Sequence, residues 1–287
     1  MDTVSPVKLS QRPRLRKPYM VAAWPGMGGV AIIAANYLRH KLGAEEFGEI
    51  DPCYFFSPAQ VLIEDHLIRT PELPESKFYS WDRGREHSLV IFTGSSQPDR
   101  GYEFACRVLD VAEEFQVVRI YTFAAFPLFI HHSRQPGVWG TATDAELTEY
   151  LKEYRVQVME SGSIGGLNGL LLGVAKERDI EGVCLLGEMP VYATQLANPR
   201  ASRAVLEVLI EMLDIEINLD ELTAWAERFE PEMEKLYNAL PEDVKEAIDR
   251  FESLTTHIRP TEAEMDRDLF EEIEDFLEEQ RSKGSGN

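Results

Sequence analysis

A glycine-rich turn near the start of the chain joins an apolar strand to a helix. Residues 19–23 are a continuous apolar run, residues 24–31 read WPGMGGVA, and residues 31–38 have a helical composition. Backbone N–H groups at such a junction lie at the positive end of the helix dipole, so the turn can hold an anion. A strand, a glycine turn and a helix in this order are typical of an α/β domain, which makes this segment the strongest constraint on the fold.

The same turn matches the dinucleotide-binding pattern G-x-G-x-x-A through Gly26, Gly28 and Ala31. Acidic residues follow near the distance expected of a ribose-binding carboxylate: Glu45, Glu46, Glu49 and Asp51. A single match of this kind is weak, because a tight turn with positive φ needs glycines as well. A dinucleotide-dependent oxidoreductase is therefore the weakest functional hypothesis, and Gly26, Gly28 and Gly29 remain candidates for binding an anion.

Short apolar segments alternate with segments of helical period through most of the chain. The expected strands are residues 19–24, 88–93, 117–125, 157–160 and 182–187. The expected helices are residues 28–42, 57–67, 99–115, 143–154, 166–178 and 198–213. The strand segments are almost continuously apolar, which is typical of strands covered on both faces. We therefore predict an α/β domain over residues 18–217, with a mainly parallel or mixed sheet and helices on both faces.

The two ends of the chain have a different composition. Residues 1–17 are basic and have no apolar periodicity, which predicts a disordered arm. Residues 218–280 predict an acidic extension of three amphipathic helices that begin near Asn218, Pro241 and Thr261. Such helices need a surface to pack on, either the α/β domain or another subunit. Residues 281–287 predict a frayed tail.

Charge and cysteine content narrow the classes of partner. The formal net charge is −21, and residues 221–287 alone contain 20 acidic and 8 basic side chains, which argues against nucleic acid and anionic membranes as partners. The uncharged stretch 19–38 contains too much Gly and Pro to span a membrane. The three cysteines are widely spaced and predict reduced thiols in a cytoplasmic protein.

A second glycine cluster, SGSIGGLNG at residues 161–169, also follows a strand and opens a helix. Its candidate ligand-binding residues are Gly162, Gly165, Gly166 and Asn168. Two such turns at the carboxyl ends of strands would face one crevice of an open α/β sheet, where ligands normally bind. The cluster lacks the Gly-Lys-Ser/Thr sequence of a phosphate-binding loop, which argues against an ATPase.

Isolated polar residues give weaker evidence for a catalytic or metal site than the glycine clusters give for a binding site. Glu188 follows the last apolar strand, where a carboxylate binds substrate, acts as a base, or simply caps a helix or pairs with a cation; Glu160 poses the same choice. His131 and His132 are adjacent, and on an extended segment their side chains point to opposite sides, so we expect no shared metal. No nucleophile–base pair or metal-ligand spacing is recognisable. We therefore predict no catalytic residue, no metal and no cofactor.

Several of these segments together resemble the proteasome assembly chaperone family. The matching segments are residues 24–29 (WPGMGG), 92–94 (FTG), 162–172, 185–190 (LLGEMP) and 198–202 (NPRAS). The resemblance implies a fold similar to nucleoside phosphorylases and hydrolases, homo-oligomers, and a role in assembling or binding the proteasome core. Archaeal proteasome binders similar to this family end in a hydrophobic-Tyr-any residue motif. This chain ends Ser285-Gly286-Asn287 and lacks that motif, which makes proteasome binding doubtful.

Two hypotheses follow from the residues and the resemblance. The favoured one is a non-enzymatic, cytoplasmic, homo-oligomeric assembly chaperone or scaffold that binds itself and a protein client. The alternative is a nucleoside- or phosphate-binding enzyme or sensor whose cleft is lined by the two glycine clusters and Glu188.

Overall fold

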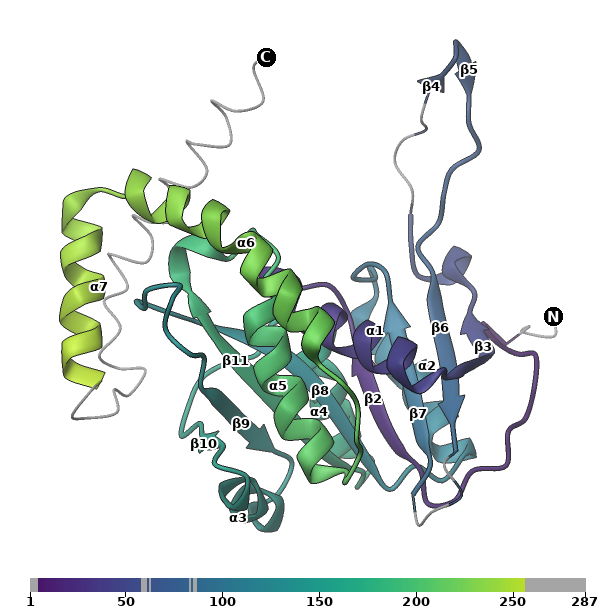
Figure 1. Ribbon diagram of the computed structural model, residues 1–287. Coiled ribbons are helices and arrows are strands. Elements are labelled where there is room, and N and C mark those ends of the chain that lie inside the picture. Colours follow the sequence, from purple (N-terminus) through teal and green to yellow (C-terminus); the bar gives the residue numbers. More distant parts are fainter. Residues whose placement is uncertain (1–4, 58–60, 62, 83, 85–86, 256–287) are drawn as a thin grey trace.

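The computed structural model describes residues 5–57, 61, 63–82, 84 and 87–255 (Figure 1). The strands are β1 (Val7–Leu9), β2 (Tyr19–Ala23), β3 (Glu45–Ile50), β4 (Ile63–Glu64), β5 (Leu67–Ile68), β6 (Ser76–Trp81), β7 (Leu89–Gly94), β8 (Arg119–Leu128), β9 (Val138–Ala142), β10 (Gln157–Val158) and β11 (Glu181–Pro190). The α-helices are α1 (Val30–Leu42), α2 (Gly101–Glu114), α3 (Ala145–Glu153), α4 (Gly166–Glu177), α5 (Pro199–Met212), α6 (Asp220–Ala239) and α7 (Glu242–Thr255). Short 3₁₀ turns are η1 (Met27–Gly29), η2 (Pro52–Tyr54) and η3 (Val191–Ala193).

One mixed sheet of nine strands organises the described residues, in the order β1-β3-β6-β7-β2-β8-β11-β9-β10. The central strands β7, β2, β8 and β11 run parallel to one another. Antiparallel strands complete both sides, with β6 beside β7 and β9 beside β11. The carboxyl ends of the four parallel strands therefore meet at one edge, where an open α/β sheet normally binds ligands.

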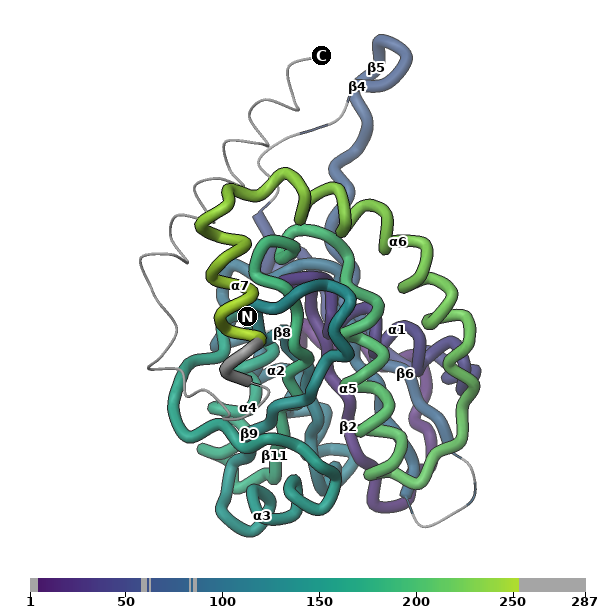
Figure 2. Tube along the Cα trace, turned by 60° about the vertical axis from the view of Figure 1, so that its left-hand side comes forward, coloured from purple at the N-terminus to yellow at the C-terminus, as the bar shows by residue number. Residues whose placement is uncertain are grey.

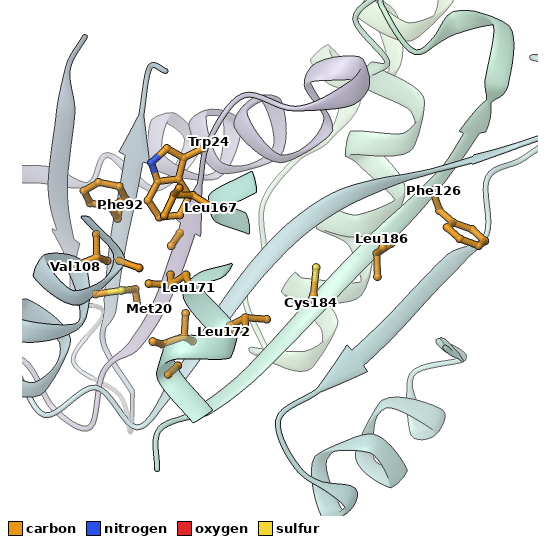
Figure 3. Packing of buried hydrophobic residues seen from close by; sticks show 14 of the residues in the cluster. Met20, Trp24, Phe92, Val108, Phe126, Leu167, Leu171, Leu172, Cys184 and Leu186 are labelled. Atoms are coloured by element: carbon orange, nitrogen blue, oxygen red, sulfur yellow. The ribbon is translucent and has the colours of Figure 1, made fainter. Parts of the chain in front are cut away.

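Helices cover both faces of the sheet (Figures 1 and 2). On one face α1 and α5 pack over inward side chains such as Val21 and Leu185. On the other face α2 and α4 pack over Met20 and Phe92, as Figure 3 shows together with Trp24. Buried apolar area on both faces stabilises the sheet and explains why the central strands have no polar face.

The helical extension packs on the α/β domain. Helix α6 contacts α5 and η3, and α7 places Val244, Ile248 and Phe251 against the apolar cluster that contains Phe129. Among the described residues, no helix is both long and apolar enough to cross a membrane. The expected third helix from Thr261 and the tail 281–287 lie outside the described residues.

The predicted fold class is confirmed: the domain is α/β, with a mixed sheet and helices on both faces. All five expected strands are present. Strands β1, β3, β6 and β9 were not expected, because they are edge or near-edge strands without continuous apolar runs. The β3 sequence EEFGEI, for example, exposes its first two glutamates.

Two local predictions were wrong. Residues 57–67 were expected to form a helix, but the described part of this segment holds β4, which pairs with β5 across a turn at Asp65 and His66, both with positive φ. The apolar spacing of residues 57–67 suggested one face of a helix. In the structure the apolar side chains of the hairpin are exposed, so no core is present against which such a helix face could pack. The basic arm was expected to be disordered, but β1 pairs with β3 and Lys8 bonds Asp51 at 2.6 Å.

Candidate functional site

The first glycine turn is closed by contacts with its own chain. Gly28 and Gly29 have φ of +62° and +61°, and their N–H groups donate to Thr194 O at 2.8 Å and Gly26 O at 2.9 Å. A Cβ on Gly28 would lie 2.9 Å from Met189 Cε. These glycines therefore serve a packed, left-handed turn, and their two N–H groups are not available to an anion.

Trp24, which precedes this turn, is fully buried against the FTG motif (residues 92–94) at the end of the neighbouring strand β7. A Cβ on Gly94 would clash with Cδ1 of Trp24, so only glycine leaves room for the indole. The Trp24 ring also packs against Phe92 and Phe104, at centroid distances of 5.0 and 6.2 Å. The glycine of the FTG motif thus has a packing role.

Asn168 connects the second glycine cluster to the first. Its Oδ1 accepts from the Trp24 N–H at 3.0 Å, and its Nδ2 donates to the Trp24 carbonyl at 3.2 Å. The side-chain amide therefore satisfies both backbone groups where β2 ends, as a neighbouring strand would. Asn168 was predicted as a ligand-binding residue, and in the structure its side chain holds α4 against β2.

Gln97 forms a second bridge between the two turns. Its Nε2 donates to the Pro25 carbonyl at 2.7 Å, and its Oε1 accepts from the Leu167 N–H at 3.0 Å. Sequence reasoning did not select this residue. Gln97 could have been found from its position shortly after the FTG motif, because this position places Gln97 at the carboxyl edge of the sheet, where ligands normally bind.

A cavity of about 530 Å³ lies between the two turns. Its polar lining comes from Gly26, Gln97, Ser163, Gly165, Gly166 and Asn168. Met27, Phe126, Ile164 and Leu186 are among its apolar lining residues. The volume is in the range of small-molecule sites. Every lining residue is uncharged, so an anion here would have no cationic side chain to pair with.

The other candidate residues lie elsewhere. Gly162 and Glu160 line a separate cavity of about 400 Å³ beside Lys176. Gly28 and Gly29 line neither of these two cavities. Of the candidates, Gly26, Gly165, Gly166 and Asn168 therefore line one cavity together, and Gly28, Gly29, Gly162 and Glu188 do not line it.

Glu188 is a buried residue with a full set of partners. It is 2% exposed, and its carboxylate accepts from Trp139 Nε1 and from the Gly137 N–H, both at 2.9 Å. Arg134 Nη2 lies 3.7 Å from the same carboxylate. A Cβ on Gly137 would lie 3.0 Å from it. The Glu188 carboxylate therefore holds the loop between β8 and β9 against β11.

The expectation that His131 and His132 point to opposite sides was wrong. Their ring centroids lie 4.1 Å apart, with an interplanar angle of 35°. The pair begins a turn, closed by the Arg134 N–H donating to the His131 carbonyl at 3.1 Å, so strand alternation does not apply.

Known proteins share this architecture. A sequence model of the PAC2 family matches residues 20–237. An uncharacterised protein of Methanocaldococcus jannaschii is 32% identical over 237 residues, which are 81% of this chain and 88% of that protein. The crystal structure of Pyrococcus furiosus PbaB, an archaeal proteasome activator, is 30% identical with a TM-score of 0.69, over 80% of this chain and 97% of that chain.

A second solved structure extends the comparison. Pyrococcus furiosus PbaA, an archaeal homologue of proteasome-assembly chaperone, is 25% identical with a TM-score of 0.63, over 88% of this chain and 98% of that chain. The family match begins in β2 and ends within α6, so it includes both glycine turns, Asn168 and Glu188. The chain belongs to the PAC2 family.

Proposed function

We propose that this protein is a non-enzymatic, homo-oligomeric assembly chaperone or scaffold that works with protein clients in the cytoplasm. Family membership and the similarity to PbaB and PbaA support a chaperone-like role. The net charge of −21 argues against a nucleic-acid partner, and all three cysteines are unpaired, which fits a reducing compartment.

The observation that carries this proposal is how the resembling motifs contact one another. Trp24 fills the space above Gly94, Asn168 pairs with the Trp24 backbone, and a Cβ on Gly187 would lie 2.8 Å from the Ala201 carbonyl. Each of these motifs thus packs against another at the carboxyl edge of the sheet. Residues with these contacts stabilise the fold, and a scaffold that binds other proteins needs a stable, well-defined surface.

A projecting hairpin offers a surface for self-association. We define the apolar arm as residues 63–68, whose Ile63, Leu67 and Ile68 are 73, 67 and 74% exposed. The arm stands clear of the body in both views (Figures 1 and 2). Exposed apolar side chains and unpaired strand edges favour contact with another chain. We assign this arm to the contact between copies.

The test is the native mass of the full chain and of a triple variant, Ile63→Glu, Leu67→Glu and Ile68→Glu. Wild type is expected to be oligomeric and the triple variant to shift to monomer, because each new carboxylate would be buried in the contact. Glu64→Gln, on the same hairpin, is the matched control and should stay oligomeric. A monomeric wild type, or an unchanged triple variant, would overturn the assignment.

Client binding is tested separately. The tagged chain is mixed with purified proteasome core particle and with its unassembled subunits, and captured species are identified by mass spectrometry. Retention of subunits above an untagged control supports the assembly role. If neither sample is retained and lysate capture recovers no other protein, the chaperone proposal fails.

The cavity of about 530 Å³ favours one second candidate, a nucleoside-binding enzyme or sensor. Because its lining is uncharged, an uncharged nucleoside fits better than a nucleotide or inorganic phosphate. A bound ligand at a hundred times its Kd should stabilise the fold by about 2.7 kcal/mol. Thermal unfolding with each of the three compounds discriminates: stabilisation by the nucleoside supports this function, and a flat response argues against it.

A further inference from the structure

A cluster of metal-ligating side chains lies outside the cavity, where the loop between β8 and β9 meets α6. One ring nitrogen of His131, one of His132 and one carboxylate oxygen of Glu234 all lie within 4.8 Å of one another. The three ligands come from segments about a hundred residues apart in the chain, so only the docking of α6 brings them together.

His132 is held in an orientation that suits a ligand. The side chain is buried, and its Nδ1 lies 2.9 Å from the Tyr192 hydroxyl, which also accepts from the His132 N–H. Its Nε2 then faces two carboxylates, 3.2 Å from Glu234 Oε2 and 3.6 Å from Glu230 Oε1. Histidine ligands typically have one nitrogen fixed by an outer partner while the other faces the metal.

The second histidine is oriented in the same way. His131 Nδ1 is 2.7 Å from Ser133 Oγ, which leaves its Nε2 for a metal. Arg200 Nη2 pairs with Glu230 Oε2 at 3.0 Å. Glu234 Oε1 accepts from Asn238 Nδ2 at 2.9 Å, and its other oxygen, Oε2, faces His132. A space of about 20 Å³, lined by both histidines and by Glu230, is large enough for one water or ion.

We propose that His131, His132 and Glu234 bind one divalent transition-metal ion and thereby fasten α6 to the loop between β8 and β9. Two imidazoles and one carboxylate are a common Zn²⁺ ligand set, with a fourth position open to water or to Glu230. Imidazole ligands select Zn²⁺, Co²⁺ or Ni²⁺ over Mg²⁺ and Ca²⁺. The ion would control how firmly the acidic helical extension is attached to the α/β domain.

Calorimetric titration of the chelator-treated full chain with Zn²⁺ tests the site. Wild type is expected to bind one ion per chain, and Mg²⁺ at the same concentration none. Glu234→Gln and His131→Ala should each weaken Zn²⁺ binding about tenfold or more. Glu232→Gln removes the same charge from an exposed position on the same helix and should bind as wild type does.

Two further measurements make every outcome decisive. Circular dichroism and thermal unfolding without metal establish that the variants are folded, which is expected because Glu234 is exposed and His131 half-buried. Hydrogen exchange should slow in α6 and in residues 129–137 when Zn²⁺ is added to wild type. Failure of wild type to bind, equal binding by Glu234→Gln, or unchanged exchange in these segments would each overturn the proposal.

Discussion

The two glycine turns have the same local sequence plan and both line one cavity, but Gly28 in the first turn is packed while Gly165 in the second is open. Each follows a strand and opens a helix, and each was a candidate anion site. At the first turn, Gly28 is packed against Met189 and Asn198, and its N–H is bonded to Thr194. At the second turn, a Cβ on Gly165 would meet no atom within 4 Å, and the residue faces a cavity of about 530 Å³.

The end of β11 and the segment after it cause this difference. The chain from Met189 to Asn198 folds back over the first turn, and the Asn198 N–H donates to the Gly28 carbonyl at 2.7 Å. No described segment covers Gly165 in the same way. Glycines in such a turn therefore show that the backbone bends tightly, while the chain packed above it decides whether a ligand can approach.

The largest expected effect is at the connection between the turns. Asn168→Leu should destabilise the protein by about 3 kcal/mol, because the buried N–H and carbonyl of Trp24 would both lose their partner. Urea unfolding of the full chain measures this loss. A change below about 1 kcal/mol would show that water replaces the amide, and that the two turns are less firmly connected than the structure indicates.

A matched pair of alanine substitutions tests the two turns directly. Gly28→Ala should cost about 1–2 kcal/mol, because an L-residue is strained at φ +62° and its Cβ would press on Met189. Gly165→Ala should change stability by less than about 0.5 kcal/mol, because its φ is −74° and the space is open. Thermal unfolding of both variants measures these changes. Equal losses of stability would show that the two turns do not differ in packing.

Removing the second bridge should have a smaller effect. Gln97→Ala should cost about 0.5–1 kcal/mol, because Gln97 is exposed and water can replace the bonds to the Pro25 carbonyl and the Leu167 N–H. Urea unfolding under the conditions used for Asn168→Leu gives the comparison. A loss as large as that of Asn168→Leu would make Gln97 the main connection.

Filling the cavity should also have only a small effect on stability. Gly165→Leu should change the unfolding free energy by less than about 1 kcal/mol, since its side chain extends into open space. It should also abolish any thermal stabilisation by a nucleoside and leave the oligomeric mass unchanged. Stabilisation that survives this substitution would place the nucleoside outside the cavity.

Sequence reasoning predicted the elements whose signal is local. Strands β2, β7 and β8 were expected because burial on both faces demands continuous apolar runs, and α5 because residues 198–213 have a helical period. The hairpin of β4 and β5 was missed because its segment has a helical period. Such a period leads to a helix only where the apolar face can pack against a core. The site was predicted only in part, since Gln97 stands in no glycine motif.

The α/β class, the positions of both glycine turns and the family resemblance were determined by the sequence itself, because these depend on periodicity and short motifs. Only the tertiary structure decided what surrounds them. Asn168 lies 144 residues from its partner Trp24, and Glu188 lies 49 from Trp139. Neither partner can be read from local propensity, because a side chain's role depends on the distant residues that folding brings within hydrogen-bond distance.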